Sequence, residues 1–191
     1  MLIYLSIYFI ILLTILKYKM TKKYKVYKSF INPEDCDLLN EWILENKIKF
    51  SEGRMKGMRL TSRYSFDIEF PKKAYEIRDE IIKKLNFTNY SFPPYKDGMV
   101  SSFAAPGDTC YLHKDPVWET GTTTIHCNIL LSDSMGGEPL IENDKLDLKK
   151  GDLWMYPVSE VKHGADLVKG EIPRTLWIFG FCFHPFNSPL N

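Results

Sequence analysis

The stretch RTLWIFGFCF, residues 174–183, has the composition of a β-strand that is buried on both faces. Successive side chains of a strand point to opposite faces of a sheet. One face of this strand is therefore large and aromatic, and it carries Trp177, Phe179, Phe181 and Phe183. The other face begins with Arg174 and continues with smaller apolar residues. We expect the aromatic face to pack under helices and the face with Arg174 to point away from them.

Further short runs of β-branched and aromatic residues precede this strand from Gly98 onward, separated by turn sequences rich in Gly, Asp and Asn. Short strands at such regular spacing are typical of a sandwich or a jelly roll. The predicted strands before residue 174 are Met99–Phe103, Tyr111–His113, Thr122–Leu131, Pro139–Glu142, Leu146–Leu148, Leu153–Tyr156 and Val161–Val168.

Two helices are predicted before the strands. Asn32 is a favourable N-cap, and it is followed by Pro33 and two acidic residues in the first helical turn. A second apolar stripe at helical spacing runs from Pro71 to about Leu85. The sequence therefore predicts an α+β fold in which N-terminal helices support an all-β jelly-roll body.

The composition describes one ordinary globular domain: 191 residues, 45% of them hydrophobic, with 25 basic and 24 acidic side chains. The charges are unevenly distributed, because six lysines and no acidic residue lie before Ser29. Residues 29–191 therefore carry 19 basic and 24 acidic side chains. A nucleic-acid partner needs a basic surface, so none is expected for this acidic body.

Residues 1–28 are predicted to be a separate apolar segment with a basic arm, in front of one domain over residues 29–191. The apolar run, residues 2–16, would span roughly 22 Å as a helix, which is shorter than a bilayer core of about 30 Å. It lacks the charge and cleavage pattern of a secretory signal. Two interpretations remain open: a membrane tether with the domain facing the cytosol, or an upstream extension before a working start at Met20. The four cysteines form no C-x-x-C pair, so we expect free thiols and a cytoplasmic location.

Three residues form a candidate metal site. His113 and Asp115 are separated by one residue where a predicted strand ends, so period-two alternation places both on one face. His163 lies in a later predicted strand. Two imidazoles and one carboxylate are the facial triad of non-haem Fe(II) oxygenases.

Arg174 adds a second chemical signal. A buried arginine without a partner is costly, and a carboxylate bound by both guanidinium nitrogens would remove that cost. The alternative is an arginine that emerges into water at the end of a strand.

The order and spacing of four motifs resemble those of the Fe(II)- and 2-oxoglutarate-dependent dioxygenases, specifically their prolyl 4-hydroxylase-like branch. The resemblance covers roughly Ser29 to Phe183. The motifs are FINPEDC (30–36), PG followed by HKD (106–115), LSD followed by GGEP (131–139), and KGDL, YP and HG (150–164). Each motif is common alone, but their combination is specific.

This resemblance implies a double-stranded β-helix (jelly-roll) core and a set of site residues. It implies that His113, Asp115 and His163 hold Fe(II) and that Arg174 binds the distal carboxylate of 2-oxoglutarate. It also implies that O2 is a co-substrate and that a C–H bond is hydroxylated as 2-oxoglutarate becomes succinate. The substrate would be a peptide residue, prolyl-like, or a small molecule.

Further contacts to the co-substrate are expected from the predicted strand Thr122–Leu131. Thr124, His126 and Asn128 share one face of that strand, which suggests a lined cavity. We expect Asn128 and Thr124 to contact 2-oxoglutarate, whereas His126 is equally well explained as a core histidine. The family usually has a tyrosine about ten residues before the H-x-D motif, and Phe103 stands there.

Other interpretations are weighed against this one. A non-oxidative cupin-type barrel would more often show H-x-H and a following glutamate, and it would leave Arg174 without a purpose. A catalytically silent binding domain would not need every ligand position filled. A nucleic-acid demethylase of the same superfamily would show a second arginine shortly after Arg174, which is the last arginine of the chain.

The region from Phe50 to Phe66, with Arg54, Lys56, Arg59 and Arg63, either edges the substrate mouth or, as we favour, is a solvated loop and strand. The oligomeric state stays open.

Overall fold

The computed structural model describes residues 23–52, 59–63, 65 and 67–184. The apolar segment 2–16 and Met20 lie outside the described residues. Within the described ranges, no helix is long and apolar enough to cross a bilayer. The elements are β1 (Lys25–Tyr27), α2 (Pro33–Asn46), η1 (Lys47–Lys49), β2 (Ser51–Glu52), β3 (Leu60–Thr61), α3 (Lys72–Lys84), β4 (Tyr90–Ser91), η2 (Lys96–Gly98), β5 (Met99–Ala104), β6 (Cys110–His113), β7 (Thr123–Leu130), β8 (Met135–Gly136), β9 (Pro139–Ile141), β10 (Asp144–Lys145), β11 (Leu153–Pro157), β12 (His163–Ala165), β13 (Val168–Lys169) and β14 (Arg174–Phe183).

Both predicted helices are confirmed. Helix α2 begins after Asn32, whose side-chain oxygen accepts a hydrogen bond of 2.8 Å from the backbone N–H of Asp35. This contact satisfies one of the backbone donors that a helix N-terminus leaves free. Helix α3 begins after Pro71 and ends before Leu85. Its buried residues recur on one side of the helix, at Ala74, Ile77 and Ile81.

The N-cap of α2 gives a stability prediction. Asn32→Ala should lower the free energy of unfolding by about 0.5–2 kcal/mol, because the N–H of Asp35 loses its acceptor. Asn32→Asp should keep most of the stability. Glu41→Ala, at an exposed position of the same helix, should stay within about 0.5 kcal/mol of the parent. Urea unfolding measures all three, and an Asn32→Ala variant as stable as Glu41→Ala would contradict the capping role.

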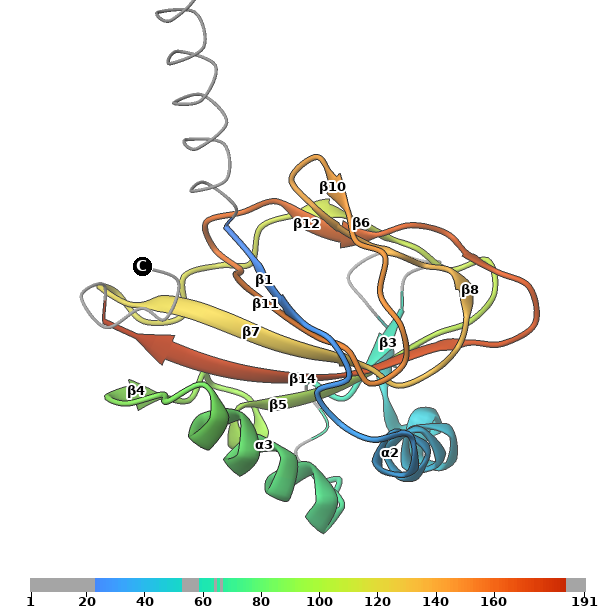
Figure 1. Ribbon diagram of the computed structural model, residues 1–191, viewed down its shortest axis with the longest axis horizontal. Coiled ribbons are helices and arrows are strands. Elements are labelled where there is room, and N and C mark those ends of the chain that lie inside the picture. Colours follow the sequence, from blue (N-terminus) through green and yellow to red (C-terminus); the bar gives the residue numbers. More distant parts are fainter. Residues whose placement is uncertain (1–22, 53–58, 64, 66, 185–191) are drawn as a thin grey trace, which may run out of the picture.

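The strands form two main sheets. The larger sheet has the order β1-β11-β7-β14-β5-β3-β2, with β4 also paired to β14, and the smaller sheet has the order β10-β9-β12-β6. Strands β8 and β13 form a separate pair. Figure 1 shows α2 and α3 against one side of the larger sheet, with β6 and β12 of the smaller sheet on the other. This arrangement is a double-stranded β-helix (jelly-roll) core with N-terminal supporting helices, as predicted.

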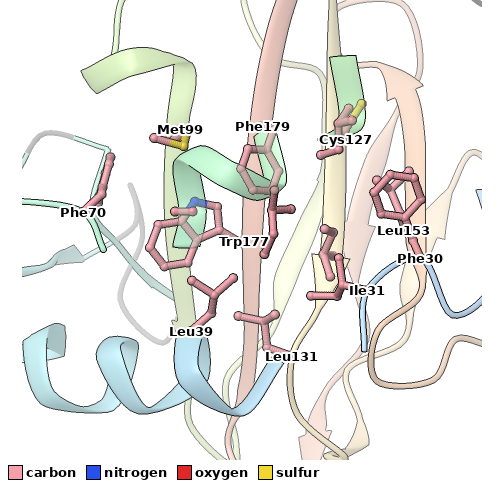
Figure 2. Packing of buried hydrophobic residues seen from close by; sticks show 14 of the residues in the cluster. Phe30, Ile31, Leu39, Phe70, Met99, Cys127, Leu131, Leu153, Trp177 and Phe179 are labelled. Atoms are coloured by element: carbon pink, nitrogen blue, oxygen red, sulfur yellow. The ribbon is translucent and has the colours of Figure 1, made fainter. Parts of the chain in front are cut away.

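The two faces of β14 divide the core as the alternation predicts. Trp177, Phe179, Phe181 and Phe183 lie in one apolar cluster with helix residues such as Leu39 and Ile77. Figure 2 shows Trp177 and Phe179 beside Leu39 and Met99 within that cluster. Leu176 and Ile178 point the other way and lie in a second cluster, between the sheets, with Trp154 and Tyr156. The face of β14 that carries Arg174 therefore points into the space between the two sheets.

Two strand predictions are wrong in detail. Leu146–Leu148 is not a strand, because the hairpin partner of β9 is the earlier pair Asp144–Lys145. Leu146 still packs in the cluster between the sheets, so burial explains its apolar character without a strand. Val161–Val168 is not one strand either. It separates into β12, which pairs with β6 and β9, and β13, which pairs with β8.

Candidate metal centre

The smaller sheet brings the three candidate metal ligands together. His113 ends β6 and His163 begins β12, and these two residues are direct partners in the antiparallel pairing. Asp115 follows two residues after His113. The imidazole rings of the two histidines lie 4.4 Å apart between centroids. The ligand atoms of all three residues lie within 4.8 Å of one another, so they can bind one ion.

Backbone hydrogen bonds fix the orientation of both imidazole rings. The Nδ1 atom of His113 lies 2.7 Å from the carbonyl oxygen of Tyr111, and the Nδ1 atom of His163 lies 3.2 Å from that of Val161. A carbonyl only accepts hydrogen bonds, so each Nδ1 carries the proton. Each ring therefore turns its Nε2 atom toward the shared centre, and a hydrogen bond from Nδ1 to a carbonyl is the usual outer support of a metal-binding histidine.

Asp115 is 8% exposed and is held from two sides. One carboxylate oxygen lies 3.4 Å from Nε2 of His113, and the other lies 3.3 Å from the guanidinium of Arg63. Burial alone would raise the pKa of Asp115, but hydrogen bonding to His113 and the positive charge of Arg63 hold that pKa well below its usual range. Asp115 is therefore an anionic ligand at neutral pH.

The pKa values of His113 and His163 are shifted in opposite directions. Hydrogen bonds to Asp115 and Cys110 raise the pKa of His113 to about 10, whereas burial lowers the pKa of His163 to about 4. Two imidazoles and one carboxylate suit a divalent first-row metal and leave further coordination positions open. A metal at this centre would take the place of the proton on Nε2 of His113. The donor set, its burial and the fixed rings all fit such an ion.

A small cavity adjoins this centre between the sheets. Its volume is about 10 Å³, which is room for about one water molecule. Its walls include the apolar side chains of Ile141, Trp154 and Leu176, and its polar lining residues are Arg59, Asn128, Tyr156, His163 and Arg174. The cavity is therefore lined both by a candidate metal ligand and by several groups that can donate hydrogen bonds.

Arg174 is the most unusual of these groups. It is 4% exposed, and within the described part of the chain it forms no ion pair. Its guanidinium lies over the ring of Trp154, 5.9 Å from the centroid. Gly137 makes room for it, since a Cβ atom there would lie 2.6 Å from Cδ of Arg174. Burial and the charge of Arg59 lower the pKa of Arg174 to about 10, so it remains a cation at neutral pH.

The polar residues predicted to share one face of β7 have different surroundings in the structure. Asn128 lines the cavity, and its amide nitrogen has only long contacts of 3.4–3.5 Å, to the carbonyls of Trp154 and His126. Thr124 is not a lining residue; its hydroxyl lies 3.4 Å from Sγ of Cys182. Phe103 lies in the helix-side cluster, on the other face of the sheet. His184 is exposed.

His126 has a partner in the core. Its Nε2 atom forms a 2.9 Å hydrogen bond with the hydroxyl of Tyr95. Gly180 allows this contact, because a Cβ atom at that position would lie 2.0 Å from the tyrosine oxygen. Burial lowers the pKa of His126 to about 3. The structure thus supports the interpretation of His126 as a satisfied core histidine.

The shifted pKa of His126 makes stability depend on pH. The unfolded chain binds a proton at this histidine below its ordinary pKa of about 6.5, whereas the folded chain does so only near pH 3. Stability should therefore fall by about 1.4 kcal/mol per pH unit from this residue as the pH drops below 6.5. Urea unfolding of the metal-free His126→Gln variant between pH 6 and 4.5 should show a slope reduced by that amount. The exposed His184→Gln variant is the control, and equal slopes in both variants would contradict the prediction.

Sequence reasoning missed three residues at this site. Arg59 and Tyr156 line the cavity, and Arg63 pairs with Asp115. From the sequence alone, a solvated loop and strand are favoured for the region that contains Arg59 and Arg63. That interpretation is wrong for these two side chains, because Arg59 lines the cavity and Arg63 contacts Asp115. The alternation that placed Asn128 inward also applies to its neighbour β11, where Tyr156 pairs with His126. The signal available in the sequence was the alternation along the predicted strand Leu153–Tyr156, which places Tyr156 on one face with Trp154.

Comparisons with known proteins support the fold. No family model and no curated protein matches the sequence. A viral collagen prolyl hydroxylase from Paramecium bursaria Chlorella virus-1, solved with 2-oxoglutarate, is 21% identical, with a TM-score of 0.60 over 85% of this chain and 97% of that one. A Trichoplax adhaerens prolyl hydroxylase in complex with a peptide fragment of hypoxia-inducible factor is 14% identical, with a TM-score of 0.64 over 90% and 88%. HygX from Streptomyces hygroscopicus, solved with nickel and 2-oxoglutarate, is 11% identical, with a TM-score of 0.64 over 88% and 85%. The chain shares the fold of these proteins, which confirms the resemblance at that level.

Proposed function

We propose that this chain is an Fe(II)- and 2-oxoglutarate-dependent oxygenase that hydroxylates a C–H bond of its substrate. One observation carries the proposal: the triad His113, Asp115 and His163 adjoins a cavity that also contains Arg174, which is buried and forms no ion pair with any described residue. The triad is a ligand set for non-haem iron. A buried guanidinium without a partner is a binding site for a carboxylate. An acid that chelates the metal at one end and carries a second carboxylate at the other would bind both the metal at the triad and the guanidinium of Arg174.

Each residue has a defined task in this proposal. His113, Asp115 and His163 hold Fe(II), and Arg174 binds the distal carboxylate of 2-oxoglutarate. The amide of Asn128 donates to the same co-substrate, which its long contacts to the described carbonyls of His126 and Trp154 support. When bound, iron and 2-oxoglutarate supply the oxidation, in which O2 yields succinate, CO2 and a hydroxylated substrate.

The cavity must widen before 2-oxoglutarate can enter, because its volume of about 10 Å³ is far smaller than a ligand of ten non-hydrogen atoms. Trp154 and Ile141 are held in the cluster between the sheets, so the widening must come from other lining residues, of which Arg59 and Arg174 have the longest side chains. Those apolar walls exclude water from the bound co-substrate, which strengthens its contacts to the charged groups.

The primary substrate is a peptide residue, prolyl-like, or a small molecule. Three large side chains close in sequence to His113 and Asp115 are exposed: Tyr111 is 54% exposed, Leu112 49% and Val117 59%. Such a surface suits contact with an apolar part of a substrate. The structural neighbours include one bound to a peptide fragment and one bound to hygromycin B, which supports keeping both substrate classes.

A turnover assay tests the proposal. Protein purified without oxygen and loaded with Fe(II) should convert 2-oxoglutarate slowly to succinate when O2 is admitted, even without primary substrate. Omitting Fe(II), or replacing it with Zn²⁺, should abolish succinate formation. A screen of peptides and metabolites for products heavier by one oxygen atom then identifies the substrate. Metal binding without any binding of 2-oxoglutarate would instead favour a non-oxidative barrel.

A further inference from the structure

The cavity contains two arginines, and the proposed co-substrate contact uses only one of them. Arg174 enters from the start of β14, and Arg59 enters from the residue before β3. In the described part of the chain, neither guanidinium has a carboxylate within ion-pair distance. Two cations thus share one cavity that no described carboxylate lines. The thiol of Cys110 also lines it, and despite burial its pKa is lowered to about 7, chiefly by the charge of Arg59.

The edge of the larger sheet explains why Arg59 points inward. Strand β3 pairs with β5, with Leu60 opposite Phe103. Both of these residues contact the helix-side cluster. Since neighbouring side chains along an extended chain alternate between faces, Arg59 points to the opposite face, which is the side of the cavity.

The electrostatics of the cavity favour an anionic ligand at this position. After burial, the charge of Arg59 is the largest cause of the lowered pKa of Arg174, so the two guanidinium groups repel each other. Asp115 already pairs with His113 and Arg63. Like charges in a water-poor site are stabilised when an anion lies between them. A carboxylate has two oxygens and can accept hydrogen bonds from two guanidinium groups.

We propose that Arg59 is a second anion-binding residue, which shares the distal carboxylate of the co-substrate with Arg174. The identity of that co-substrate, 2-oxoglutarate, rests on the proposed function. The two-arginine site itself rests on the placement of Arg59 and Arg174 in one cavity without a carboxylate. The site therefore selects a dicarboxylate over a monocarboxylate of the same length.

Direct binding measurements test this assignment without turnover. Protein loaded with Ni²⁺ is titrated calorimetrically with 2-oxoglutarate and with 2-oxovalerate, which has the same chain length but no distal carboxylate. Arg59→Met should weaken binding of 2-oxoglutarate by at least about 10-fold, since hydrogen bonds to charged groups contribute about 1.5–3 kcal/mol. It should change binding of 2-oxovalerate by less than about 2-fold.

Lys162→Met is the matched control, because it removes one positive charge at an exposed position next to His163 in the sequence. It should leave both affinities unchanged. Arg59→Lys should give an intermediate loss, because lysine keeps the charge but not the planar fork. This variant also covers the case in which Arg59→Met does not fold, which its urea unfolding curve would reveal.

Two results would overturn the role of Arg59: unchanged affinity of Arg59→Met for 2-oxoglutarate, or equal weakening of both ligands. Failure of the wild-type protein to bind 2-oxoglutarate would instead overturn the proposed function. In that case glutarate, titrated into metal-free protein and followed calorimetrically, tests Arg59 independently. Wild-type binding of glutarate that Arg59→Met loses would support the two-arginine site, and glutarate binding unaffected by Arg59→Met would refute it.

Discussion

His163→Ala is expected to abolish metal binding and succinate formation together. Removing the partner that merely orients a metal ligand already costs about 10- to 100-fold in affinity, so losing the ligand itself should weaken Fe(II) binding by more than about 100-fold. The fold should survive, because among the described residues the ring removed is hydrogen-bonded only to the carbonyl of Val161, two residues earlier in the chain.

His184→Ala is the matched control for this variant, since His184 is exposed and follows the last strand. Both variants are compared by Fe(II) titration without oxygen and by succinate formation after O2 is admitted. Full activity of His163→Ala, or equal losses in the two variants, would mean that the metal does not bind at the triad.

Arg174→Met is expected to act in opposite directions on binding and on stability. Truncating one partner of a buried charge pair costs about 2–5 kcal/mol, so the affinity for 2-oxoglutarate should fall by about 30-fold or more. The ligand-free protein should be as stable as the parent or more stable, because a buried cation that forms no ion pair with the described residues is replaced by an apolar side chain of similar length.

Three measurements separate the role of Arg174 in ligand binding from a structural role. Calorimetry with Ni²⁺-loaded protein gives the affinity for 2-oxoglutarate, urea unfolding gives the stability of the ligand-free protein, and metal titration should show that the triad still binds its ion. A loss of stability of more than about 1 kcal/mol would show that the protein itself satisfies Arg174. Loss of metal binding would show that Arg174 supports the triad instead of the co-substrate.

The sequence predicted the architecture because alternation along a strand is a local property. Residues 174–183 show it without ambiguity, and the structure places Trp177 against the helices and Leu176 between the sheets. The cap at Asn32 is equally local, since its partner is only three residues away. The triad was predictable because His113 and Asp115 lie close in the sequence and His163 pairs directly with His113.

The remaining features depend on contacts between distant segments. Nothing near Arg59 in the sequence indicates that it enters a cavity bounded by residues some fifty to one hundred and fifteen positions later. Thr124 and Asn128 share a face of β7, but the cavity reaches only one end of that face. The end of the face with Thr124 is instead closed by Cys182 from β14. The extent of a cavity is set by neighbouring strands. Alternation along β7 therefore predicts which residues face the cavity side of the sheet, but not which of them line the cavity.

The carbonyl groups that orient the metal-binding rings have a consequence for how this surface can diversify. Tyr111 holds His113 through its main chain, while its side chain is largely exposed beside the triad. Any residue at position 111 supplies the same carbonyl, so the exposed side chain can be replaced without turning the imidazole. Under the proposed function, substrate recognition and retention of the metal would depend on different atoms of this residue, so replacing the side chain at position 111 should change substrate preference without loss of metal binding.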